Sequence, residues 1–197
     1  MRVIGLTGGI ASGKSAVAKM LEEKGAYLID ADVLAREAVE PGRPAWQDLV
    51  DWLGDSILLP DQNIDRLQLA GLVFKDREKL DKLNSIVHPR VGLRFAELAG
   101  SIKKSDPDAV VIYDVPLLIE AGMHKVVDLV LLVYVSREIQ LARLQDRDDL
   151  SRSEAKLRLE AQMPLEEKKK YADVIIDNSS TLKETARQVN KFWKKFK

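Results

Sequence analysis

The residues best suited to chemistry form a glycine-rich run near the start of the chain. Residues 8–15 read GGIASGKS, which matches the spacing GxxxxGK[ST] directly after a short apolar run. Glycines let the backbone curl closely around an anion, so that successive N–H groups and the first turn of the next helix face its negative charge. A chance glycine-rich turn is the alternative, but the full spacing and its context favour a phosphate-binding loop.

The two residues that end this run have distinct expected roles. Lys14 can reach the β- and γ-phosphates of ATP, and the Ser15 hydroxyl is placed to ligate Mg²⁺. We therefore predict Lys14 as a catalytic residue and ATP and Mg²⁺ as cofactors. The expected ATP-binding residues of the loop are Gly8, Gly9, Ala11, Ser12, Gly13, Lys14, Ser15 and Ala16.

Two carboxylates, followed by an arginine, stand where a second apolar run ends. Asp30 directly precedes an expected helix, so its side chain suits an N-cap, whereas Asp32 lies in the first turn with a freer side chain. An aspartate in that place can orient an attacking hydroxyl and accept its proton. We predict Asp32 as the general base and Arg36, one turn later, as a ligand of an anionic acceptor; a solvated helix arginine is the open alternative.

Further charged residues follow the third and fourth apolar runs. Asp114 ends the third run and is expected to hold Mg²⁺ directly or through water, with a strand-end cap as the alternative. Arg143 and Arg147 lie four residues apart and could face ATP phosphates from one side of a helix. Ion pairs with nearby aspartates are the alternative for both arginines.

Five short apolar runs supply the elements that would position these side chains. Their hydrophobicity is unbroken rather than alternating, as in strands covered on both faces by helices. This pattern predicts an α/β fold with a five-stranded parallel sheet, the three-layer sandwich of P-loop proteins. The runs are Val3–Leu6, Tyr27–Ile29, Val110–Tyr113, Leu129–Val135 and Val174–Ile176.

Helical segments are expected between these runs. Residues 15–24 predict a helix that ends at Gly25. About 80 residues separate the second and third runs, too many for one crossover, so we expect a helical insertion over about 31–105. Within it, residues 76–87 predict one helix and Pro89 opens the next. A charged segment over about 136–170 predicts a helical lid, all within one domain over 1–197.

Composition excludes several classes of function. Basic and acidic residues number 31 each, so no basic excess points to nucleic acid or an anionic membrane. The chain has no cysteine, which excludes disulfides and thiolate chemistry. Its start resembles neither a signal peptide nor a membrane span. We expect a cytoplasmic protein with a small-molecule substrate, no nucleic acid, no membrane and no obligate protein partner.

Several motifs together resemble one family, the dephospho-coenzyme A kinases. The segments that carry this resemblance are LTGGIASGKS, IDADVLAR, VEPG, NSIVHPRV, DVPLLIE, QDRDDLS, RLEAQMP and ADVIIDNSS, which span nearly the whole chain. The family transfers the γ-phosphoryl group of ATP to the ribose 3′-hydroxyl of dephospho-coenzyme A.

The resemblance implies roles for specific residues. It implies that Asp32 is the base, that Arg147 is catalytic, that Arg143 and Arg147 bind ATP, and that Asn178 lies near the adenine. The acceptor residues that it implies are Asp32, Arg36, His88, Leu117, Leu118 and Glu120. His88 also fits a local packing role, and the two leucines also fit a core.

The chain departs modestly from the family pattern, and other functions stay open. Ala11 and Ala16 replace a frequent glycine and threonine, and Ile119 replaces an aromatic residue, but no required functional group is lost. A nucleoside monophosphate kinase or another small-molecule kinase would share Lys14 and the lid arginines. A nucleotide-gated interaction protein is a further alternative, although the sequence shows no NKxD guanine motif.

Overall fold

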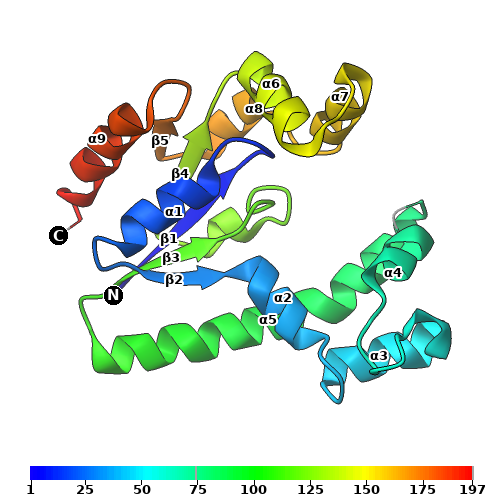
Figure 1. Ribbon diagram of the computed structural model, residues 1–197. Coiled ribbons are helices and arrows are strands. Elements are labelled where there is room, and N and C mark those ends of the chain that lie inside the picture. Colours follow the sequence, from blue (N-terminus) through cyan, green and yellow to red (C-terminus); the bar gives the residue numbers. More distant parts are fainter. Residues whose placement is uncertain (74, 197) are drawn as a thin grey trace. The chain divides into compact units, whose positions relative to one another are not determined.

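The computed structural model describes residues 1–73 and 75–196, which form two compact units. The sheet unit comprises Met1–Ile29 and Lys103–Lys197, and the helical unit comprises Asp30–Ile102. Figure 1 shows the strands and helices of each unit.

The sheet unit is built on five strands in the order β2-β3-β1-β4-β5. The pairs β1–β3, β1–β4 and β4–β5 are parallel, with Ile4 of β1 opposite both Ile112 and Leu129. Each strand coincides with an apolar run singled out in the sequence, so the predicted five-stranded α/β sheet is confirmed. The strands are β1 (Arg2–Gly8), β2 (Tyr27–Asp30), β3 (Val110–Asp114), β4 (Leu129–Tyr134) and β5 (Val174–Asp177).

Two helices of this unit, α1 (Lys14–Glu22) and α9 (Leu182–Trp193), cover one face of the sheet. Their buried side chains join strand residues in one hydrophobic cluster. The helix predicted after the phosphate-binding loop is therefore α1, and Gly25, at φ 95°, lies in the turn that follows it. The cluster comprises Ile4, Leu6, Val17, Ala18, Leu21, Ala26, Val110, Ile112, Leu131, Val133, Ile176, Val189 and Phe192.

The charged segment after β4 forms helices, as the sequence indicates. Ser136 caps α6 (Arg137–Asp148), and a capping box of Ser151 and Glu154 begins α7 (Arg152–Glu160). Then come α8 (Leu165–Lys168) and the 3₁₀ turn η3 (Lys169–Tyr171); another, η2 (Met123–Lys125), precedes β4. Buried residues of α6 and α7 pack against two residues of the phosphate-binding loop, Ile10 and Ala11.

The helical unit has its own core. Leu49, Ile57 and Ile64 are buried at its centre, surrounded by half-buried residues that include three large side chains, Trp46, Trp52 and Ile86. This core explains why the long interval between strands folds rather than forming a loop. Its elements are α2 (Ala31–Ala38), α3 (Pro44–Leu53), η1 (Asp55–Ile57), α4 (Arg66–Val73) and α5 (Arg77–Ser105), the last extending beyond the unit.

The expected break at Pro89 is wrong, because α5 runs through it as one helix of 29 residues. A proline inside a helix removes one backbone hydrogen bond and crowds the preceding turn. Contacts on both sides of the proline hold the helix together. Ile86 packs into the core of the unit, and Arg90 donates to the Ile86 carbonyl at 2.9 Å and pairs with Asp48 of α3.

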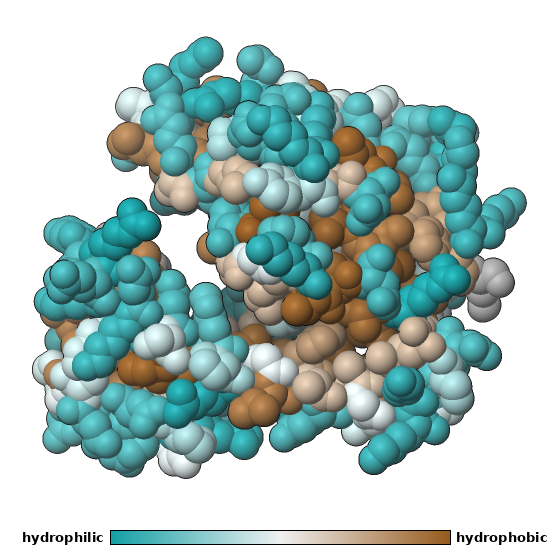
Figure 2. All heavy atoms as spheres, turned by 180° about the vertical axis from the view of Figure 1, so that it is seen from behind, coloured by the Kyte–Doolittle hydropathy of each residue, from teal (hydrophilic) through white to brown (hydrophobic). Residues whose placement is uncertain are grey.

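Hydrophobic side chains also reach the surface. Figure 2 shows apolar atoms gathered over part of one face, beside hydrophilic side chains. Large apolar residues that are well exposed include Val126, Leu67 and Leu157. Among the described residues, no helix has both the length and the apolar character needed to cross a bilayer.

Candidate active site

The phosphate-binding loop joins β1, which ends at Gly8, to α1, which begins at Lys14. Gly13 adopts a left-handed conformation, with φ 84°, immediately before the helix. A Cβ atom at this position would overlap Nδ2 of Asn178, so both the backbone angle and the space require glycine. Ala11 also has a positive φ, 59°, and its methyl group packs against α6 and α7.

Side chains from distant segments hold the loop in place. Ile10 is fixed at both backbone groups: Gln140 of α6 donates to its carbonyl at 2.8 Å, and its N–H donates to Gln162 at 2.9 Å. The Asn178 amide donates to the Ser12 carbonyl at 2.8 Å. These hydrogen bonds tie backbone groups of Ile10 and Ser12 to the rest of the protein, so the shape of the loop is set before any ligand binds.

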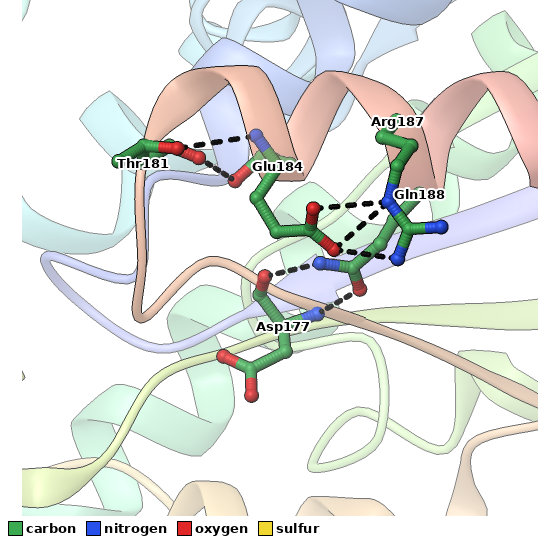
Figure 3. A network of polar contacts seen from close by, with 6 residues as sticks. Asp177, Thr181, Glu184, Arg187 and Gln188 are labelled. Atoms are coloured by element: carbon green, nitrogen blue, oxygen red, sulfur yellow. Dashed lines mark hydrogen bonds and ion pairs between the residues drawn. The ribbon is translucent and has the colours of Figure 1, made fainter.

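Asn178 follows β5 and is itself held on both sides. Its side-chain oxygen accepts a hydrogen bond from the buried Thr185 hydroxyl of α9 at 2.7 Å. Figure 3 shows how β5 is joined to this helix: the Gln188 amide donates to the Asp177 carbonyl and accepts from its N–H. Both ends of the Asn178 amide therefore contact protein, and the residue supports the loop that the sequence places beside the nucleotide.

Lys14, at the start of α1, forms an ion pair with Asp114, the last residue of β3. Both side chains are largely buried, which strengthens their attraction relative to a pair in water. Ser15 is exposed, and its hydroxyl forms no hydrogen bond with another described residue. A lysine, a serine hydroxyl and one carboxylate are the protein groups that a nucleotide with Mg²⁺ requires.

The loop also contains an unsatisfied buried hydroxyl. Ser12 is 1% exposed, and its Oγ has no hydrogen-bond partner in the described part of the protein. A buried polar atom without a partner is costly. A loop with a left-handed glycine, N–H groups at the start of α1 and this hydroxyl fits a bound phosphate chain. No cluster of three or more histidine, cysteine or acidic side chains occurs among the described residues, so Mg²⁺ here would need phosphate or water oxygens as further ligands.

The two lid arginines differ in their surroundings. Arg143 donates to the Asn178 carbonyl at 2.9 Å and so lies beside the loop. Arg147 instead pairs with Asp148 at 2.7 Å, and Arg158 shares the same carboxylate. This hydrogen-bonded pairing raises the pKa of Arg147 and lowers the pKa of Asp148. Of the two lid arginines, Arg143 thus bonds to the segment beside the loop, whereas the described ion pair of Arg147 is with its own neighbour.

Asp30, the last residue of β2, has the helix-capping role that the sequence predicts for it. Its carboxylate caps α2 by accepting from the N–H groups of Asp32 and Val33 at 2.8 and 3.2 Å. Asp32 is exposed, and its side chain bonds to no described residue. Arg36 lines a cavity of about 510 Å³ together with Arg66, and neither arginine forms an ion pair with another described residue.

The other expected acceptor residues occupy diverse environments. His88 lies in α5, where partial burial lowers its pKa. After β3, Leu117 is 46% exposed, whereas Leu118 is fully buried against the sheet and thus has the environment of a core residue. Glu120 pairs with Lys168 at 3.0 Å.

Several residues of this region carried no signal in the sequence. Gln140, Thr185 and Lys168 are buried polar residues in helices that otherwise read as ordinary surface helices. Gln140 and Lys168 bond to groups more than 45 residues away along the chain, whereas Thr185 bonds to the side chain of Asn178, seven residues before it. A buried polar residue on an amphipathic helix face is the only pattern that could have indicated them.

Comparison with known proteins decides the family. The family model described as dephospho-CoA kinase matches residues 2–184. The chain belongs to the dephospho-CoA kinase family. It is 51% identical over 194 residues to the dephospho-CoA kinase of Geobacter metallireducens, with 98% of this chain and 96% of that protein covered. The predicted family and kinase class are thereby confirmed.

Solved structures agree with this placement among dephospho-CoA kinases. TT1252 from Thermus thermophilus aligns over 100% of this chain and 98% of its own, with a TM-score of 0.85 and 34% identity. The dephospho-CoA kinase from Campylobacter jejuni aligns over 99% and 97%, with a TM-score of 0.67 and 26% identity. An ATP-dependent kinase is the function class of the family.

Proposed function

We propose that the protein transfers the γ-phosphoryl group of ATP to the ribose 3′-hydroxyl of dephospho-coenzyme A. The observation that carries the proposal is the braced phosphate-binding loop with its Lys14–Asp114 pair, in a chain of the dephospho-CoA kinase family. Such a site positions phosphates and stabilises their charge, and these two effects supply most of the catalysis in phosphoryl transfer.

Asp32 is the proposed general base. Its carboxylate is exposed and free of protein partners, whereas the neighbouring Asp30 is committed to capping α2. A ribose hydroxyl is a poor nucleophile, so a carboxylate that orients it and accepts its proton accelerates attack on the γ-phosphorus. The proton leaves the hydroxyl for Asp32 as the new O–P bond forms and ADP departs.

Mg²⁺ is proposed to be held by Ser15 and Asp114. The free Ser15 hydroxyl and the Asp114 carboxylate are oxygen donors of the kind this ion prefers. When bound, the ion neutralises charge on the β- and γ-phosphates. Lys14, paired with Asp114 in the protein alone, would contact the phosphates of bound ATP.

The acceptor is proposed to bind through the helical insertion, about residues 31–105. Arg36 forms no ion pair with another described residue, and its guanidinium suits the diphosphate of dephospho-coenzyme A. The same cavity is also lined by Arg66 and by three acidic residues, Glu40, Asp61 and Asp65. His88 of the same unit, and Leu117 and Glu120 after β3, remain proposed acceptor contacts. Leu118 contributes through the core that holds this segment.

The lid, about residues 136–170, is proposed to complete the ATP site. Arg143 is proposed to contact phosphates beside the loop. Arg147 would leave its ion pair with Asp148 and contact the transferred phosphoryl group when ATP binds. Asn178 is proposed to act on ATP by shaping the loop. We also propose a cytoplasmic location, with no nucleic acid, membrane or obligate protein partner, from the balanced charge of the sequence.

The substrate is tested by mass spectrometry of reactions with Mg²⁺, ATP and one acceptor at a time. One added phosphoryl group is expected on dephospho-coenzyme A and none on AMP, CMP or shikimate. Transfer to another acceptor alone would refute the substrate assignment while leaving a P-loop kinase.

The base is tested with two matched substitutions. Asp32→Asn should keep ATP affinity and lose about 10²–10⁴-fold in kcat, the usual contribution of a general base. Asp30→Asn makes the same chemical change two residues away, and asparagine still caps a helix, so its kcat should remain near that of the parent. An Asp32→Asn enzyme as active as the Asp30→Asn enzyme would exclude Asp32 as the base.

A further inference from the structure

Lys168 is a lysine with no exposed surface at the end of α8. Lysine is almost never fully buried unless it is paired, because removing its charge from water is costly. The next two lysines of the sequence, Lys169 and Lys170, reach solvent. The burial of this one ammonium group therefore calls for a specific explanation.

The Lys168 ammonium joins two polar groups of the segment after β3. It donates to the Pro116 carbonyl at 2.9 Å and lies 3.0 Å from the Glu120 carboxylate. The Pro116 carbonyl also accepts from the buried Thr7 hydroxyl of β1 at 3.0 Å. Glu120 in turn accepts from the Met163 N–H at 3.3 Å, where the chain leaves α7.

Three segments of the candidate active site thus meet at one cation. Thr7 directly precedes the phosphate-binding loop, Pro116 is two residues after Asp114, and Met163 connects α7 to α8 within the lid. We propose that Lys168 is a positioning residue for phosphoryl transfer. It fixes the segment after Asp114 against β1 and against the connection between α7 and α8. The inference rests on the function proposed above.

The electrostatics of the site are consistent with this role. Burial is the main cause that lowers the pKa of Lys168, the Lys14 charge acts in the same direction, and Glu120 opposes both. The two ammonium groups therefore interact within the same buried region. A positive charge behind the loop also favours the phosphates that Lys14 contacts.

A merely structural lysine would behave differently from a positioning residue. Removing one partner of a buried ion pair destabilises a protein, because the other charge is left uncompensated. A lysine with only that structural role would lose stability when neutralised, but the protein that remains folded would keep its turnover. Loss of turnover in a folded protein of unchanged ATP affinity is what a positioning role requires.

The absence of cysteine allows a nearly isosteric test. In a Lys168→Cys variant the single thiol is alkylated in the unfolded chain with 2-bromoethylamine, which restores an ammonium of lysine length. Alkylation with 1-iodopropane gives the same shape with a methyl group in place of the ammonium. Both forms are refolded and compared with the parent by circular dichroism, and Lys168→Met serves as a second uncharged variant that needs no refolding.

The measurements are kcat, the KM of each substrate, and the Kd of ATP with and without Mg²⁺. We expect the propyl form and Lys168→Met to lose at least tenfold in kcat, with the Kd of ATP alone within threefold of the aminoethyl form. The gain in ATP affinity that Mg²⁺ provides should fall at least fivefold, because Asp114 is displaced. The aminoethyl form should recover both quantities to within threefold of the parent.

Two outcomes separate this inference from the proposed function. A propyl form or folded Lys168→Met protein with kcat and Mg²⁺ gain within twofold of the charged forms overturns the role of Lys168. The second outcome is a parent protein whose ATP affinity rises with Mg²⁺, to an extent that depends on Lys168, but which does not phosphorylate dephospho-coenzyme A. That result overturns the proposed acceptor and leaves Lys168 as a positioning residue.

Discussion

Replacement of Gly13 by alanine tests whether Asn178 braces the phosphate-binding loop. Gly13 has φ 84°, and an added methyl group would overlap the Asn178 amide, which is 3% exposed. Gly25 offers a matched control, because its φ is 95° but nothing lies within 4 Å of an added Cβ. The two substitutions share the backbone strain and differ in the clash.

The expected cost of each substitution follows from these surroundings. Alanine in the left-handed region costs about 1–2 kcal/mol, so Gly25→Ala should lower the free energy of unfolding by about that amount. In Gly13→Ala the displaced Asn178 amide also leaves the Ser12 carbonyl without its side-chain donor. An unsatisfied buried group adds about 1–3 kcal/mol.

Urea unfolding and ATP titration measure these effects. Gly13→Ala should be less stable than Gly25→Ala by about 1–3 kcal/mol and should lose ATP affinity, whereas Gly25→Ala should bind ATP like the parent. In an Asn178→Ala background the clash is absent, so Gly13→Ala should cost no more than Gly25→Ala does. Equal destabilisation by both glycine substitutions in the parent would refute the bracing role.

Four further substitutions probe the site and its support. Arg147→Ala should lower kcat about tenfold or more and change the free energy of unfolding by less than about 1 kcal/mol, because its pair with Asp148 is exposed. Arg143→Ala should mainly raise the Kd of ATP, measured by calorimetry, since Arg143 lies beside the loop. Thr185→Val, which removes a buried hydroxyl, should lower the free energy of unfolding in urea by about 1–3 kcal/mol. Partial burial lowers the pKa of His88, so the unfolded chain binds its proton first; stability should fall as pH drops below 6.5, and His88→Gln should flatten that part of the profile.

The sequence predicted the parts of the fold that local pattern determines. Each strand was identified because a buried parallel strand needs an unbroken apolar run, and Ile4, Ile112 and Leu131 are indeed buried in one cluster. The end of α1 was predicted because the left-handed backbone at Gly25 favours glycine. These features depend on neighbours within a few residues.

The local sequence pattern did not predict features that depend on contacts between residues distant in sequence. Pro89 indicated a helix boundary, but the helix continues through it. Arg90 donates to the Ile86 carbonyl across the proline, and Ile86 packs into the core of the helical unit. Lys168 stands in the run EEKKKY, which reads as a solvated charged face. Which of its three lysines is buried depends on how α8 packs against the segment after β3, and composition cannot show this.

Supports of the phosphate-binding loop were equally hidden, and topology explains why they converge. Asn178 and Ser12 are 166 residues apart in the chain, yet they share a hydrogen bond. In a parallel sheet all strands end at the same edge. Asp114 at the end of β3 and Gln140 in the helix after β4, the two neighbours of β1, therefore both reach the loop. The strand order, rather than any motif, selects these residues. A search for supports of a phosphate-binding loop should therefore examine the first polar side chains after every strand, and the first turns of the helices that follow.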